Sequence, residues 1–197
     1  MAVLRTAPGG RRGGATAALL AVLFLALPAA AARSPEKELE YKVKAAVLYN
    51  FAKFVEWPAA AFPEPRSPFN LCVLGDDPFG PSLDRTVAGE SIDGRPIAVQ
   101  RGARLAELKG CHLLFVSHSE RERQREVLAA LRDAAVLTVG DAGRFLDDGG
   151  MIDFVLEGNK VRFEVNLTAV EKSPLKISSK LLRLARVVRP EAGGGGV

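Results

Sequence analysis

Residues 43–58 constrain the fold of this chain more than any other stretch, and their sequence is VKAAVLYNFAKFVEWP. A helix formed by this stretch would carry apolar residues on every side, which makes it too apolar for a surface helix. Lys44, Lys53 and Glu56 interrupt it too often for a membrane span. The stretch therefore requires a folded body around it, in which each of its few polar side chains faces a specific environment.

The helix that contains this stretch is expected to begin just after Ser34. Ser34 can cap the first turn, and Pro35 suits the first helical position. We predict that the helix runs as far as Trp57, because Pro58 cannot continue it.

The first 32 residues have the composition of a secretory signal peptide. A basic stretch, 5–12, precedes the apolar run 15–27, and small residues follow at 29–32. The apolar run is too short to span a bilayer as a mature helix, and no cysteine follows it that could carry a lipid anchor. We predict a cleaved Sec signal peptide over residues 1–32, with an uncleaved anchor as the alternative.

The formal charge of +4 does not indicate a nucleic-acid-binding protein. The first 32 residues hold three arginines and no acidic residue, so the rest of the chain has 24 basic and 23 acidic residues. A composition with 48% hydrophobic and 25% charged residues is ordinary for a soluble domain. We expect a single domain over 33–190 in the periplasm and a disordered glycine-rich tail over 191–197.

Short apolar runs alternate with helical segments along the rest of the chain, which indicates βαβ units and a parallel sheet. The last strand signals, 151–156 and 160–165, alternate cleanly and flank a Gly-Asn turn, as in an antiparallel hairpin. We therefore predict an α/β fold: a three-layer sandwich with a mostly parallel sheet, an antiparallel C-terminal hairpin edge and helices on both faces. The expected parallel strands are 69–74, 97–100, 111–116 and 136–139, with a charged helix over 119–131.

Polar residues at the two ends of the predicted domain form the candidate site. Asn50, Lys53 and Trp57 are spaced three and four residues apart, so a helix would place them on one face. A second helix is expected over 178–188, and its segment carries a basic stripe that comprises Lys176, Lys180, Arg183 and Arg186. If the two helices pack together, they form a ligand- or partner-binding pocket with an anion-attracting rim and an aromatic floor. Alternatively, Trp57 fills a hole in the core and the basic stripe is simply solvated.

Cys72 and Cys111 both lie on predicted strands and do not form a C-x-x-C redox motif. In an oxidising compartment we expect them to pair, and a closed loop of this length stabilises a fold by roughly 4 kcal/mol in the chain-entropy model. Two buried free thiols are the alternative, because sequence alone does not show that the two Cα atoms approach each other.

The chain lacks the motifs of several enzyme classes that use such a sheet. Ser117 and His118 stand where a phospho-receiver domain carries its acceptor aspartate, and the turn at 75–80 lacks a dinucleotide fingerprint. There is no G-x-S-x-G elbow. The two histidines, His112 and His118, make no convincing metal set, and we interpret His112 as structural. We predict no catalytic residues, no metal and no cofactor; an unrecognised hydrolase is the weakest hypothesis.

Four motifs in order along the chain resemble the YfiR-like family of periplasmic proteins. They are residues 43–58, CHLLF at 111–115, GGMIDF at 149–154 and KISSKLLRLA at 176–185. The resemblance implies an α/β sandwich that forms homodimers, and the Cys72–Cys111 pair is similar to one of the family's disulfides. Some members have a second pair near the hairpin, where this chain has Phe145 and Ile152.

The same resemblance implies a regulator without catalytic activity. It would bind the periplasmic sensory domain of an inner-membrane signalling protein, a diguanylate cyclase above all, and repress cyclic-di-GMP synthesis and biofilm formation. An outer-membrane lipoprotein of the OmpA type would release the cyclase by sequestering the repressor. The alternative function is a periplasmic small-ligand-binding protein that serves a histidine kinase or an outer-membrane receptor.

Overall fold

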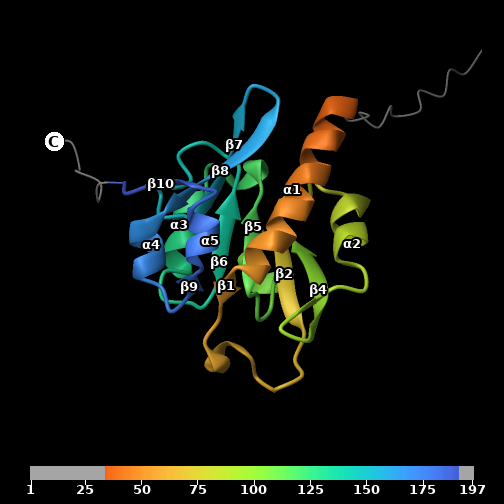
Figure 1. Cartoon of the computed structure of the whole chain (residues 1–197), viewed down its shortest axis with the longest axis vertical. Coiled ribbons are helices and arrows are strands. Elements are labelled where there is room, and N and C mark those ends of the chain that lie inside the picture. Colours follow the sequence, from red (N-terminus) through yellow and green to blue (C-terminus); the bar gives the residue numbers. More distant parts are fainter. Residues whose placement is uncertain (1–33, 191–197) are drawn as a thin grey trace, which may run out of the picture. The chain divides into compact units, whose positions relative to one another are not determined.

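The computed structural model of this chain describes residues 34–190. The predicted signal peptide and the predicted glycine-rich tail lie outside these residues. An eight-stranded sheet in the order β10-β8-β7-β6-β5-β2-β4-β3 forms the centre of the domain (Figure 1). The strands are β2 (Phe69–Leu74), β3 (Ser91–Ile92), β4 (Arg95–Gly102), β5 (Leu113–Val116), β6 (Leu137–Gly140), β7 (Ile152–Glu157), β8 (Lys160–Asn166) and β10 (Arg186–Val188).

The sheet is mixed and mostly parallel. Strands β4, β2, β5, β6 and β7 run parallel to one another, β3 is antiparallel to β4, and β8 is antiparallel to β7. The β7–β8 hairpin is present as predicted, and β10 pairs with the outer side of β8.

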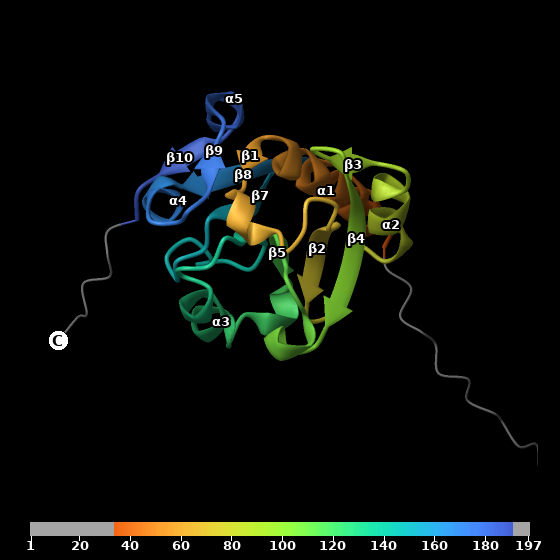
Figure 2. The ribbon, with the colours of Figure 1, turned by 90° about the horizontal axis from the view of Figure 1, so that it is seen from below.

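Helices cover both faces of this sheet, so the predicted three-layer α/β fold is confirmed. Figure 2 shows α1 and α2 on one face and α3 on the other. Alternate residues of β2 serve the two layers: Leu71 and Val73 pack on the side of α1, whereas Cys72 and Leu74 pack on the side of α3. Burial of both faces explains the continuous apolar runs of the central strands. The helices are α1 (Pro35–Lys53), α2 (Pro81–Val87), α3 (Gln124–Ala130), α4 (Leu167–Glu171) and α5 (Ser179–Leu182).

Cys72 and Cys111 form a disulfide, with their Cα atoms 5.9 Å apart. Cys72 lies in β2, and Cys111 lies two residues before β5, the neighbouring strand. The bond therefore joins two adjacent parallel strands at the end where β5 begins, and the alternative of two free thiols is wrong.

The first helix is shorter than predicted. It ends at Lys53, and the N–H of Phe54 donates to the carbonyl of Phe51 in a tighter, final turn. Pro58 disfavours helical backbone at the residue before it, and Val55 suits a strand better than a helix. Residues 55–56 form strand β1 instead, so the prediction of a helix up to Trp57 was wrong.

Two other predicted helices are also shortened. The segment 178–188 contains only one helical turn, α5, and then returns as strand β10, where Val187 lies opposite Val165 of β8. An open sheet edge beside two β-branched residues favours the strand. The helix expected over 119–131 covers only 124–130, because the preceding residues form a 3₁₀ turn over 118–120 and further turns.

Candidate functional site

The two ends of the domain meet in a small separate sheet. Strand β1 (Val55–Glu56) pairs antiparallel with β9 (Lys176–Ile177), and the N–H of Ser178 donates to the carbonyl of Phe54 at 2.8 Å. The segment that carries the C-terminal cations therefore lies beside the end of α1. The predicted meeting of the two segments takes place, but through paired strands rather than packed helices.

Trp57 does not share a helix face with Asn50 and Lys53, because α1 ends before it. Its indole N–H donates to the carbonyl of His112 at 3.1 Å, and its ring packs edge-on against Phe69 with centroids 4.9 Å apart. Trp57 thus fixes the chain that leaves β1 onto the main sheet. The prediction that it forms the open floor of a pocket beside the other two side chains does not fit this geometry.

His112 is buried, and the backbone satisfies both of its ring nitrogens. Nδ1 accepts the N–H of Asn70 at 2.9 Å, so Nε2 carries the proton and donates to the carbonyl of Ala61 at 3.2 Å. Its ring stacks on Phe62 and Phe69. Burial lowers the pKa of His112, so the ring is held neutral as a structural element.

Four exposed cations lie on the two segments that β1 and β9 bring together, and we call them the terminal surface: Lys53 at the end of α1, Lys176 in β9, Lys180 in α5 and Arg183 just after α5. Across the described residues, no carboxylate forms an ion pair with any of them, although Glu56 lies opposite Lys176 in the ladder. Lys53 Nζ lies 4.7 Å above the ring of Tyr49. Arg186, the fourth member of the predicted stripe, lies instead on β10 and pairs with Glu164.

An exposed apolar side chain adjoins these cations. Leu184 follows Arg183 directly and is 70% exposed. Asn50 is also exposed, one turn before Lys53 on α1. A net positive surface with an exposed leucine suits contact with an acidic protein surface, in which charge guides the encounter and the leucine supplies apolar contact.

A second polar group, which the sequence analysis did not identify as a site, lies where α1 crosses the carboxyl end of β6. Lys44 Nζ is within 2.7 Å of Asp141 Oδ2 and 2.6 Å of Glu40, and the hydroxyl of Tyr41 donates to the same Asp141 oxygen. Lys44 is only 3% exposed. The one hint in the sequence was a lysine inside an apolar helix.

Asp153, opposite Gly140 in the sheet, completes this buried group. Burial and the nearby charge of Asp141 raise the pKa of Asp153 to about 7, while Lys44 acts in the opposite direction. One oxygen each of Asp141 and Asp153 has no hydrogen-bond partner. These residues hold α1 against the sheet through charge in a buried setting, where partner loss is costly.

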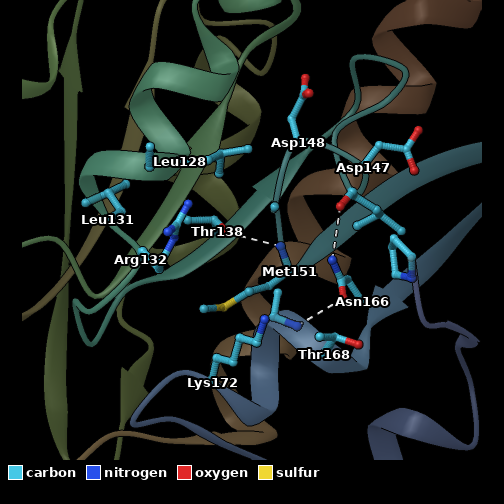
Figure 3. A pocket seen from close by; sticks show the side chains of 15 residues that line it. Leu128, Leu131, Arg132, Thr138, Asp147, Asp148, Met151, Asn166, Thr168 and Lys172 are labelled. Atoms are coloured by element: carbon cyan, nitrogen blue, oxygen red, sulfur yellow. Dashed lines mark hydrogen bonds between the residues drawn. The ribbon is translucent and has the colours of Figure 1, made fainter. Parts of the chain in front are cut away.

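A pocket of about 380 Å³ lies on the other side of the sheet, between α3 and α4. Figure 3 shows Leu128 and Leu131 on the α3 side, Thr168 and Lys172 on α4, and Asp147 and Asp148 on the connecting turn. Thr138 accepts a hydrogen bond from the Met151 N–H at its base. No sequence motif had indicated this pocket, because its lining comes from five separate segments.

Comparison with protein families identifies the chain. Residues 41–186 match the YfiR/HmsC-like family. This chain belongs to that family. YfiR/HmsC-like proteins are periplasmic and regulatory rather than catalytic, and at the level of the family they are regulators of diguanylate cyclases. The match covers α1 from Tyr41 onward, the main sheet up to Arg186 and all four cations of the terminal surface, so this surface belongs to the YfiR/HmsC-like domain.

Within residues 34–190, no helix of this YfiR/HmsC-like domain is both long enough and apolar enough to cross a bilayer. The same residues contain no group of three or more histidine, cysteine, aspartate or glutamate side chains arranged to hold a metal ion.

Proposed function

We propose that this protein binds the periplasmic sensory domain of an inner-membrane diguanylate cyclase through the terminal surface and holds the cyclase inactive. The protein would thereby lower cyclic-di-GMP and limit biofilm formation. The observation that carries this proposal is the set of four unpaired, exposed cations beside Leu184, in a chain whose family regulates such cyclases.

The chemistry of this surface supports protein binding. Unpaired cations steer an acidic partner toward the surface, and a protruding leucine can anchor in an apolar pocket of that partner. Pairing of β1 with β9 holds the two segments that carry these cations next to each other. The same proposal includes export by the N-terminal signal and release of the cyclase when an OmpA-type outer-membrane lipoprotein captures the repressor.

The proposal is tested with the charge-reversal variant Lys176→Glu/Lys180→Glu/Arg183→Glu. We expect at least a tenfold loss of affinity for the purified sensory domain and a rise of cellular cyclic-di-GMP to the level of a deletion strain. The matched control is Lys42→Glu/Lys109→Glu/Arg121→Glu, which reverses three exposed cations that form no ion pair and lie elsewhere on the described domain. This control should bind and repress like the wild type.

Two results would overturn the proposal. Deletion of the protein with no change in cyclic-di-GMP would exclude repression of a cyclase. Full repression by the charge-reversal variant would exclude the terminal surface as the binding site.

A further inference from the structure

We propose that the pocket between α3 and α4 binds a small organic monoanion, namely a carboxylate with an apolar body. The site is separate from the terminal surface and does not depend on the proposed function. It rests on the shape of the pocket, the state of its charged groups and the nature of its walls.

About half of the residues that line the pocket are apolar, and the fold holds them in place. Leu128, Leu146 and Met151 are buried members of the wall, and Leu131 is half-buried. A pocket of about 380 Å³ with such walls is within the range that small ligands occupy. The apolar walls favour a ligand with an aliphatic or aromatic body.

Two cations in this pocket are left without ion pairs. Arg132 follows α3 and Lys172 follows α4, and neither pairs with a carboxylate of the described residues. Neighbouring cations differ: Arg125 pairs with Asp148, and Arg189 pairs with Glu171. Arg132 and Lys172 therefore offer positive charge that the domain itself does not neutralise, which suits an anionic group.

The other polar groups that line the pocket limit the ligand to a single negative charge, and they indicate at which end of the pocket this charge lies. Figure 3 shows the carboxylates of Asp147 and Asp148 at the opposite end of the pocket from Arg132 and Lys172. Arg125 pairs with Asp148, but no described cation forms an ion pair with Asp147, so the charge of Asp147 disfavours an anion at that end. Thr138 is only 3% exposed, and because its oxygen accepts the Met151 N–H, its own hydrogen remains available to donate to a ligand.

The experiment uses the complete exported protein and three probes of equal chain length: hexanoate, hexanol and hexylamine. Isothermal titration and thermal unfolding should show that hexanoate binds and raises Tm, whereas the neutral and cationic probes do so at least tenfold more weakly. The variant Arg132→Gln/Lys172→Gln should lose at least tenfold in hexanoate affinity. Both side chains are exposed, so this variant is expected to keep the Tm of the free protein.

A matched control, Lys109→Gln/Arg121→Gln, removes two exposed cations that lie outside the pocket and outside the terminal surface, and it should bind hexanoate like the wild type. A second variant, Ala169→Leu, adds bulk to the pocket wall without changing charge and should also abolish binding. Failure of hexanoate to bind, equal binding of hexanol, or unchanged affinity in either pocket variant would each overturn the proposal.

Discussion

Lys44, a residue of α1, is buried with three acidic residues around it. A buried ion pair adds little net stability compared with apolar residues, yet removal of one partner is costly because the other stays buried and charged. Lys44 lies near Asp141 and Glu40, with Asp153 close behind. Its role is therefore to fix the position of α1 on the carboxyl end of β6.

We expect Lys44→Met to lower the free energy of unfolding by about 3–5 kcal/mol, because Asp141 and Glu40 lose their cation. Urea unfolding measures this change. Lys42→Met is the control, since Lys42 is exposed on the same helix and its loss should cost less than about 0.5 kcal/mol. Equal stability of the two variants would show that the buried pair does not hold α1.

The free energy of unfolding depends on pH through Asp153, and the raised pKa of this residue determines the direction of the dependence. Its ordinary pKa is 3.8 and its folded pKa is about 7, so the folded state binds the proton more tightly. The contribution of Asp153 to stability is therefore largest at acid pH, falls as the pH rises from about 4 to 7, and is constant above that. For Asp153→Asn, we expect a stability advantage over the wild type that grows by up to about 3 kcal/mol between pH 5 and pH 8.

Denaturant unfolding at a series of pH values measures this difference. Asp133→Asn serves as the control because Asp133 is exposed, and its difference from the wild type should stay constant with pH. If the Asp153→Asn curve ran parallel to that of the wild type, Asp153 would not titrate as its burial indicates.

At the scale of elements, the disulfide links β2 to the segment that enters β5. The loop it closes contains α2 and also β4 and β3, the two strands at one edge of the sheet. We expect Cys72→Ala/Cys111→Ala to lower the free energy of unfolding by about 2–5 kcal/mol while the parallel pairing of β2 and β5 persists. Thermal unfolding and circular dichroism measure the two effects. The wild type in reducing agent should match this variant, and an unchanged Tm in both would contradict the prediction.

A comparison of the predicted and observed bounds of the helices and strands shows which parts of the fold can be predicted from the sequence. The central strands were predicted to within two residues, because burial on both faces leaves a local apolar run. The ends of α1 and α5 were predicted wrongly. Val55 and Val187 adopt strand conformation because they pair with residues far away in the chain. Such non-local pairing leaves no periodic pattern in the sequence.

At the scale of the whole molecule, the fold class and the family follow from sequence, but the sites follow only in part. Lys53 and Lys176 were predicted to lie near each other, and β1 with β9 does bring their segments together. The prediction that Trp57 shares a helix face with Asn50 and Lys53 was wrong because α1 ends before it, and the local sequence pattern does not distinguish a ring that packs on Phe69 from one on a helix face. Arg132 and Lys172 gave no signal, because a pocket assembled from separate segments has no motif.

Strands β1 and β9 lie about 120 residues apart in the chain. Closing so long a loop carries an entropy cost that must be met before the contact forms. When the chain is released from its N-terminus onward, the end of α1 therefore has no strand partner until almost the entire domain has emerged. The fold cannot be completed from the first helix onward, because one of the last segments to emerge determines when the end of that helix is fixed in place.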